Sequence, residues 1–260
     1  MPRFAANLSM LWPELEVYDR FRAAAEAGFS RVEILFVHTL DHARLERALK
    51  DHKLELVLFD PEPGDWEAGE RGLACKPGRE QEFETTIRGA LETAKRLGVR
   101  KLNVLTGIPD AGTTEADAKR TIIRNFESVA PLAEASGVML LIENINTTDF
   151  PGYFVSTVIR AAEIVDAVGR ANVRVQLDQY HVGMMGGDAQ ELMRKHAQNI
   201  AHIQIADVPG RHEPGTGQQP IPEFLNLLDE IGYAGAVGLE YRPSSTTDAA
   251  LAWLPVEQRA

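Results

Sequence analysis

Apolar and polar residues alternate with a period of two along the stretch Val173 to His181, which predicts a β-strand. One side of this strand would carry Val173, Val175 and Leu177, and the other Arg174, Gln176 and Asp178. A strand of an α/β protein is normally apolar on both faces, because helices cover one face and the side chains of other strands fill the other. The polar face and its terminal carboxylate therefore indicate a functional role for this strand.

Three further strand-like runs, 138–144, 200–207 and 235–241, also carry an oxygen-bearing side chain at or near their ends. With Asp178, the four side chains are Glu143, Asp178, Gln204 and Glu240. Because the C-terminal ends of neighbouring parallel strands open on one mouth of a sheet, we expect these four groups to converge there. Ala236 and Gly238 share a face with Glu240, and we expect such small residues to leave space beneath its carboxylate.

Strand-like and helix-like runs alternate along the whole chain. The remaining expected strands are 4–8, 31–37, 54–60 and 101–107. The expected helices are 13–28, 41–51 with Asp41 as its N-cap, 80–97, 114–136, 156–168, 188–198 and 221–231. Two long irregular segments, 61–79 and 208–220, are of the kind that shapes or covers a site.

This order of elements predicts an α/β protein with a single (β/α)8 TIM barrel domain over residues 1–260. The length of 260 residues agrees with the ~250 typical of that fold, and no linker or internal repeat divides the chain. The competing architecture is an open doubly wound sheet, whose dinucleotide-binding form requires a glycine-rich turn after the first strand. The segment Asn7 to Trp12 contains no glycine, which argues against it.

The overall charge limits the classes of partner. A net charge of −11 would repel nucleic acid and anionic membrane surfaces, and no run approaches the ~20 apolar residues of a membrane span. The single Cys75 excludes an intramolecular disulfide and fits a reducing compartment. The N-terminus lacks the pattern of a signal peptide, so we expect a cytoplasmic protein. A homo-oligomer is compatible with the sequence.

The four converging side chains indicate a divalent cation. Three carboxylates at one barrel mouth would raise each other's pKa unless a cation lay among them. An all-oxygen set, Glu143, Asp178, Gln204 and Glu240, suits Mg²⁺ or Mn²⁺ better than Zn²⁺, and His181 or His202 could add a nitrogen. The alternative for each residue alone is a helix cap or a partner of an arginine.

Glu143 and Glu240 are also the candidate catalytic residues. On opposite sides of a chelated carbonyl and its adjacent hydroxyl, one could remove a C–H proton and the other return it, with the cation as a Lewis acid. This chemistry predicts isomerisation or epimerisation. His181 and Arg211 are candidate substrate contacts, the arginine through a forked contact with an anion. Arg71, Lys76 and Arg79 are weaker candidates for that task, and we expect Glu33 to pair with Arg174 or Gln176 as a structural residue.

Motifs along the whole chain resemble those of the hydroxypyruvate isomerases, small members of the xylose isomerase-like TIM barrels. They are RFAANLSMLW, GDWEAGERGLACKPGREQEF, LLIENIN with DFPGY, QLDQYH, HIQIADVPGRHEPGTG and VGLEYRP. The resemblance implies a divalent cation on Glu143, Asp178, Gln204 and Glu240, with Glu143 and Glu240 as the proton-transfer pair. It also implies that the substrate is a small anionic hydroxy-oxo acid. The implied reaction is the interconversion of hydroxypyruvate and 2-hydroxy-3-oxopropanoate (tartronate semialdehyde).

Two alternatives remain within the resemblance. The opening MPRFAANLSM also resembles the 2-oxo-tetronate isomerases, which act on an acid one carbon longer. A ketose 3-epimerase is the less favoured alternative, since those enzymes usually carry a histidine where this chain has Gln204. Family members often have PGTGE where this chain has Gly217-Gln218, so a loop carboxylate is missing that could affect substrate preference. A barrel that binds a sugar acid without converting it is the non-enzymatic alternative.

Overall fold

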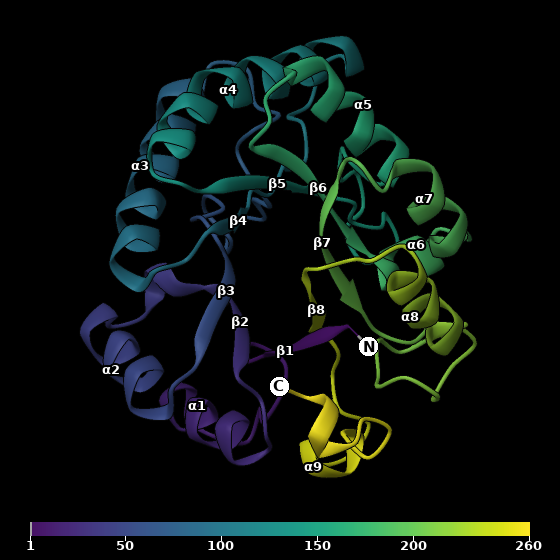
Figure 1. The fold of residues 1–260 in the computed structure, drawn as a ribbon. Coiled ribbons are helices and arrows are strands. Elements are labelled where there is room, and N and C mark those ends of the chain that lie inside the picture. Colours follow the sequence, from purple (N-terminus) through teal and green to yellow (C-terminus); the bar gives the residue numbers. More distant parts are fainter. Residues whose placement is uncertain (1) are drawn as a thin grey trace.

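Eight parallel strands close into one barrel in the order in which they occur along the chain (Figure 1). The computed structural model describes residues 2–260. The strands are β1 (Arg3–Asn7), β2 (Arg31–Phe36), β3 (Glu55–Asp60), β4 (Lys101–Asn103), β5 (Met139–Glu143), β6 (Val173–Asp178), β7 (Ile200–Ile205) and β8 (Ala236–Leu239). β1 pairs in parallel with β8, with Ala6 opposite Leu239, and so closes the ring. The expected (β/α)8 barrel is confirmed.

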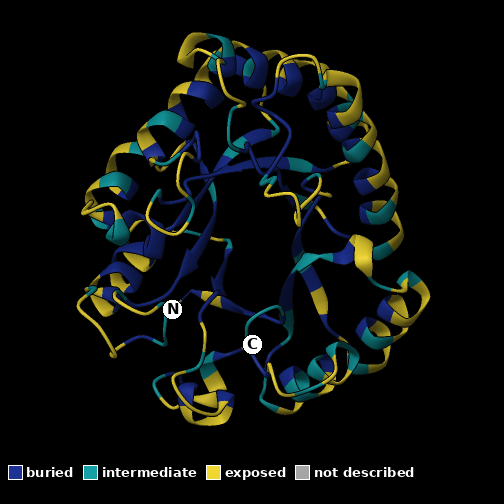
Figure 2. Cartoon of the chain, turned by 180° about the vertical axis from the view of Figure 1, so that it is seen from behind, coloured by how far each residue is buried: buried dark blue, intermediate teal, exposed yellow. Residues whose placement is uncertain are grey.

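Helices surround the barrel on the outside (Figure 1). They are α1 (Val17–Glu26), α2 (His42–His52), α3 (Glu80–Leu97), α4 (Glu115–Ala135), α5 (Val158–Val168), α6 (Gln179–Met184), α7 (Ala189–His196), α8 (Ile221–Glu230) and α9 (Thr247–Ala250), with 3-10 turns at Val37–Thr39 and Val256–Gln258. Their exposed residues lie on the outer surface, whereas the strands are largely buried (Figure 2). Within residues 2–260, no helix is both long and apolar enough to cross a membrane.

Local sequence signals explain where several helices begin and end. The side chain of Asp41 accepts hydrogen bonds from the backbone N–H groups of Ala43 and Arg44, which confirms it as the N-cap of α2. The side chain of Thr114 caps α4 in the same way. Gly98 ends α3 in the left-handed conformation that glycine adopts at low cost. The predicted boundaries of α3 and α4 therefore agree with the structure to within one residue at each end.

Several local features differ from the expectation: β4 ends at Asn103 and not at 107, and α9 follows β8 where no helix was expected. Pro13 does not open α1, which begins at Val17. Trp12 adopts a positive φ of 52° and its backbone N–H donates to Oγ1 of Thr247, so a turn precedes the helix. The short helix α6 follows β6 directly, where no helix was expected.

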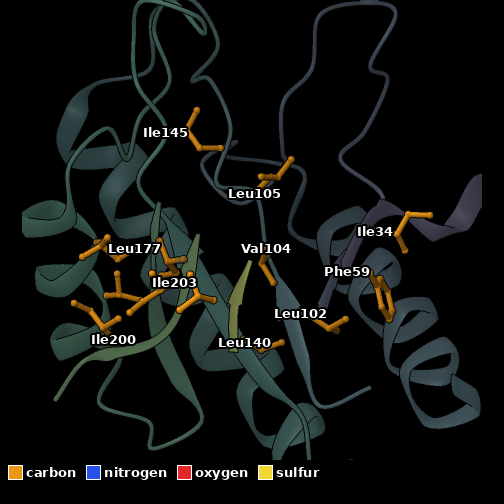
Figure 3. Close-up of a cluster of buried hydrophobic side chains, with 14 of the residues drawn as sticks. Ile34, Phe59, Leu102, Val104, Leu105, Leu140, Ile145, Leu177, Ile200 and Ile203 are labelled. Atoms are coloured by element: carbon orange, nitrogen blue, oxygen red, sulfur yellow. The ribbon is translucent and has the colours of Figure 1, made fainter. Parts of the chain in front are cut away.

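Two kinds of interior meet at the strands. Between the strands and the helices the side chains are apolar, including Phe59, Leu102, Leu140 and Ile203, which Figure 3 labels. Burial of this apolar surface provides the main driving force for folding, at about 25 cal/mol per Å². The centre of the barrel instead contains fully buried polar side chains, among them Glu33, Gln176 and His202. Polar side chains in such a position must pair with one another.

Candidate active site

A pocket lies at the C-terminal ends of the strands, where TIM-barrel enzymes place their active sites. Its volume is about 180 Å³, which suits a small molecule. The charged and histidine residues lining it are Asp60, Arg71, Glu143, His181, Arg211, Glu240 and Arg242. Apolar and aromatic side chains complete the wall, namely Met10, Leu35, Phe36, Trp66, Leu105, Ile145, Phe150 and Tyr153.

Glu143 is the last residue of β5 and is buried. Its Oε2 accepts a 2.6 Å hydrogen bond from Nδ2 of Asn103, the last residue of β4. Its Oε1 lies 3.8 Å from Nε2 of His181. Burial, followed by repulsion from Glu240 and Asp178, raises the pKa of Glu143 well above its usual range. Asn103 therefore fixes in place a carboxyl group whose pKa is raised.

Asp178 ends β6 and uses its two oxygens differently. Oδ1 caps α6 by accepting the backbone N–H groups of Tyr180 at 2.7 Å and His181 at 3.4 Å. Oδ2 lies 3.3 Å from Nη2 of Arg211 and 3.5 Å from Nε2 of His181. Burial raises the pKa of Asp178 to about 6, although Arg211 lowers it. The cap fixes the carboxylate so that one oxygen faces the pocket residues.

The geometry around His181 assigns its proton to Nε2. Oδ1 of Asn146 accepts the backbone N–H groups of Thr148 and Asp149, which fixes the orientation of its amide. Nδ2 of Asn146 must therefore donate to Nδ1 of His181, at 2.6 Å. Burial, with Arg211 nearby, lowers the pKa of His181 well below its usual range, so the ring is neutral with its remaining proton on Nε2. His181 is thus a hydrogen-bond donor toward the carboxylates and is not set up as a metal ligand.

Glu240 directly follows β8 and is buried. Its Oε1 lies 3.2 Å from Nη2 of Arg211. Its Oε2 is buried and has no hydrogen-bond partner among the residues described. Burial raises the pKa of Glu240 to about 8, with Arg211 lowering it and Asp178 raising it. An unpartnered buried carboxylate oxygen is costly, so this atom is available for a ligand.

Arg211 lies in the loop after β7 and is held between two carboxylates. Its Nη2 contacts both Asp178 and Glu240, and its guanidinium carbon lies 4.8 Å from the centroid of the Tyr180 ring. The backbone of Arg211 adopts a φ of 56°, which is uncommon for a residue other than glycine. Because Nη2 contacts two carboxylates, the positive charge of Arg211 is largely satisfied within the protein.

Gln204 lies beneath these groups. Its Oε1 accepts a 2.6 Å hydrogen bond from Nε2 of Gln176, and its Nε2 donates to Oε2 of Glu33 at 3.0 Å. These two contacts fix the amide, and a second lone pair remains on Oε1. Of the four side chains expected to converge, Glu143 and Glu240 line the pocket and Asp178 contacts its residues, while Gln204 lies in the polar layer below.

Two expectations about the interior were wrong. Glu33 pairs with His202, whose Nε2 lies 2.5 Å from Oε1 of Glu33, and with Gln204, instead of with Arg174 or Gln176. His202 is not among the residues that line the pocket. The space beneath Glu240 is not empty either, because a Cβ added to Gly238 would lie 2.4 Å from Oε2 of Glu33. Gly238 makes room for the buried Glu33 carboxylate.

Asp60 and Asn103 were missed as site residues. Asp60, the last residue of β3, lines the pocket, and Nδ2 of Asn103 donates to its Oδ2 at 3.4 Å. Burial, with repulsion from Glu240, raises the pKa of Asp60 well above its usual range. The signal that identified Glu143 and Asp178, a polar side chain at the end of an expected strand, is present at Asp60 but not at Asn103, which lies inside the expected strand 101–107.

Among the three basic residues of the loop 61–79, only Arg71 reaches the pocket. Lys76 pairs with Asp110 and, at 3.6 Å, with Glu70, and Arg79 pairs with Glu70 and Glu82. Lys76 and Arg79 thus hold the loop together and are not among the residues that line the pocket.

The donor set fits a hard divalent cation. An oxygen of Glu143 and an oxygen of Asp178 lie within 4.8 Å of each other, and Oε2 of Glu240 has no hydrogen-bond partner within residues 2–260. Arg211 is the one positive side chain that contacts these carboxylates in the described structure. Oxygen donors with excess negative charge are what Mg²⁺ and Mn²⁺ prefer.

Comparison with known proteins identifies one protein family along nearly the whole chain. The model of the xylose isomerase-like TIM barrel family matches residues 21–255. The 2-oxo-tetronate isomerase of Cupriavidus necator is 45% identical over 98% of this chain and 98% of its own. The hydroxypyruvate isomerase of Escherichia coli K12 is 40% identical with the same coverage.

Solved structures of other proteins share the fold of this chain. One from Brucella melitensis, described as an AP endonuclease of family 2, has a TM-score of 0.94 at 45% identity and covers 97% of this chain and 98% of its own. An Escherichia coli 3-keto-D-glucoside 4-epimerase has a TM-score of 0.79 at 19% identity and covers 98% of both chains, which shows the shared fold alone. The resemblance to hydroxypyruvate isomerases inferred from sequence is confirmed, and the chain belongs to the xylose isomerase-like TIM barrel family.

Proposed function

We propose that this chain is a divalent-cation-dependent isomerase that interconverts hydroxypyruvate and 2-hydroxy-3-oxopropanoate. The observation that supports this most is the pair Glu143 and Glu240, two buried carboxyl groups from different strands that line one pocket. Both have a raised pKa, which suits groups that exchange a proton with carbon near neutral pH. A protein that only binds a sugar acid needs no such pair.

The two glutamates account for the proton movements. One carboxylate takes a proton from C3 of hydroxypyruvate, and the electrons left behind form the enediolate across C2 and C3. The other glutamate, which is protonated, gives its proton to C2, and the proton of the C3 hydroxyl passes to the C2 oxygen, so that C3 becomes the aldehyde carbon and C2 carries the hydroxyl. Microscopic reversibility requires the two glutamates to exchange roles in the reverse reaction.

Other side chains hold the substrate. Nε2–H of His181 donates to a substrate oxygen, because Asn146 fixes that proton toward the pocket. Arg211 offers Nη1 to the substrate, since its Nη2 is bound to Asp178 and Glu240 and its Nε points to a backbone carbonyl. These donors stabilise the negative charge that develops on oxygen.

Glu143, Asp178, Gln204 and Glu240 would hold the cation, Mg²⁺ or Mn²⁺. When bound, it would supply Lewis-acid polarisation of the substrate carbonyl. Glu33 and Gln176 orient the amide of Gln204 from below.

We further propose that residues 1–260 work as one catalytic domain. We also propose a cytoplasmic location, because the buried free thiol of Cys75 is compatible with a reducing environment.

A 2-oxo-tetronate is the second candidate substrate, favoured by the 45% identity to an enzyme of that name. Ketose 3-epimerisation has weaker support, because solved epimerases of that kind are only 19–22% identical. Nuclease activity, which the description of one similar structure suggests, is disfavoured by a net charge of −11.

A side-by-side assay tests the proposal. Metal-stripped protein is given Mg²⁺ or Mn²⁺ and offered hydroxypyruvate, a 2-oxo-tetronate and a ketohexose, and kcat/KM is compared. We expect the highest value with hydroxypyruvate. A higher value with the four-carbon acid would make the chain a 2-oxo-tetronate isomerase, and turnover of the ketohexose alone would make it an epimerase.

A further inference from the structure

The substrate proposed above carries a carboxylate, and the pocket must hold it beside several acidic side chains. Asp60, Glu143 and Glu240 line the pocket and would repel an anion. Arg211 cannot offset this repulsion alone, because Asp178 and Glu240 already neutralise its guanidinium. Besides the proposed divalent cation, a basic side chain without a carboxylate partner would favour binding of the substrate carboxylate at this pocket.

Arg71, in the loop between β3 and α3, is such a side chain. It lines the pocket and, among residues 2–260, forms no salt bridge. Its Nη1 donates to the backbone carbonyls of Trp66 at 2.9 Å and Glu70 at 2.7 Å. No described hydrogen bond uses its Nε or Nη2. Those two N–H groups form the side-on edge of the guanidinium that binds a carboxylate through two parallel hydrogen bonds.

The loop holds this guanidinium in place before any ligand arrives. The guanidinium carbon of Arg71 lies 3.8 Å from the centroid of the Trp66 ring, in a cation–π contact. The Trp66 ring packs edge-on against Phe36, with ring centroids 5.2 Å apart, so the loop is tied to the end of β2. Because the side chain is already ordered, binding an anion costs little further conformational entropy.

Arg242 is the other pocket arginine that forms no salt bridge within the described residues, but its side chain is exposed. No described hydrogen bond or ring contact fixes its guanidinium. It therefore adds positive potential at the pocket mouth without a fixed geometry, and Arg71 is the better-ordered anion ligand.

We propose that Arg71 binds the substrate carboxylate through Nε and Nη2 and thereby selects 2-oxo acids over uncharged ketones. This inference rests on the proposed function. It assigns the carboxylate to the loop between β3 and α3, and leaves Arg211 and His181 to the oxygens of the reacting carbons. Lysine at this position would keep the charge and lose the fork.

Equilibrium binding tests the assignment without turnover. Pyruvate keeps the carboxylate and the ketone but lacks the hydroxyl group, and pyruvamide replaces the carboxylate by a neutral amide. Calorimetry in excess Mg²⁺ gives the Kd of each for the wild type, Arg71→Gln, Arg71→Lys and the control Arg88→Gln. Arg88 lies on α3 outside the pocket, where it pairs with Glu84. Thermal melts of all four proteins report whether they are folded.

We expect the wild type and Arg88→Gln to bind pyruvate at least about tenfold more tightly than pyruvamide, as a charge-assisted pair of hydrogen bonds provides. Arg71→Gln should lose this preference, and Arg71→Lys should retain only part of it. A wild type without the preference, or a folded Arg71→Gln that keeps it, would overturn the inference. If Arg71→Gln does not fold, Arg71→Lys decides: an unchanged preference overturns the inference and a reduced one supports it. Loss of preference in a protein that does not turn over hydroxypyruvate would overturn the proposed function and leave Arg71 as the anion ligand.

Discussion

Nε2 of His202 lies 2.5 Å from Oε1 of Glu33 at the centre of the barrel, where both side chains are fully buried. Burial lowers the pKa of His202, so the ring is neutral and its Nε2–H donates to the carboxylate. The other carboxylate oxygen accepts the amide N–H of Gln204 at 3.0 Å. Glu33 thus joins β2 to β7 and orients a side chain that we propose to be a cation ligand.

Removing the Glu33 carboxylate should strongly destabilise the barrel. Glu33→Ala would leave the buried donors of His202 and Gln204 without an acceptor, so we expect a loss of about 3–5 kcal/mol in the free energy of unfolding. Urea titration followed by circular dichroism measures it. Glu55→Ala, which breaks an exposed contact with Arg31, should cost less than about 1 kcal/mol. Equal small losses in both variants would argue against a structural role for Glu33.

The architecture and the strand-end carboxylates could be predicted because they depend on local patterns. A period of two marks a strand and a period of 3.6 marks a helix, so alternating patterns predict the barrel. A parallel barrel then brings all strand ends to one mouth whatever their exact boundaries. Glu143, Asp178 and Glu240 were found for this reason.

The partners inside the barrel could not be predicted from those patterns. Whether Glu33 meets Gln176 or His202 depends on the stagger of the strands around the closed ring, which a single strand does not encode. The proton on Nε2 of His181 depends on Asn146 in the loop after β5, through a contact across 35 positions. Asp60 could have been found, because it ends a strand just as Asp178 does.

Gly238 should be intolerant of even the smallest side chain. A methyl group there would meet the Glu33 carboxylate at 2.4 Å, and that carboxylate cannot move without losing its buried hydrogen bonds. We expect Gly238→Ala to cost about 1–3 kcal/mol in thermal or urea unfolding. Gly89→Ala in α3 is the control, since a methyl group there meets nothing within 4 Å and should stabilise the helix by up to about 1 kcal/mol. A Gly238→Ala protein as stable as Gly89→Ala would refute the close contact.

Stability without metal should fall as pH rises. Burial raises the pKa of Asp178 to about 6 and that of Glu240 to about 8, above the values of about 4 for unfolded carboxyl groups. Between about pH 4 and about pH 8 the folded state therefore binds more protons than the unfolded state. The stabilisation by these protons is complete below about pH 4 and is lost as pH rises through about 8.

Divalent cations should reverse that loss. They bind the deprotonated carboxylates, so the rise in Tm on adding Mn²⁺ to chelator-treated protein should be larger at pH 8 than at pH 5. Differential scanning fluorimetry at both values measures it. A rise in Tm that is independent of pH, or absent, would speak against a cation on these side chains.

Changing Asn146 to Asp should switch the tautomer of His181. The aspartate would accept where Asn146 donates, so the ring proton would move from Nε2 to Nδ1 and the donor toward the substrate would be lost. We expect kcat to fall about 10–100-fold, as for other residues that orient a site side chain. Nitrogen-15 NMR of the histidines reports the tautomer directly. An Nε2 proton that persists in Asn146→Asp, or an Nδ1 proton in the wild type, would contradict the assignment.

Proton NMR of hydroxypyruvate in D₂O tests proton transfer by the two glutamates most directly. Metal-stripped wild type, Glu240→Gln and the exposed control Glu230→Gln are compared before and after Mg²⁺ or Mn²⁺ is added. We predict cation-dependent appearance of hydrated 2-hydroxy-3-oxopropanoate with the wild type and Glu230→Gln. With a folded Glu240→Gln the rate should be at least about 100-fold lower, the contribution of a positioned acid or base. Turnover by Glu240→Gln within a few-fold of the wild type would contradict the account.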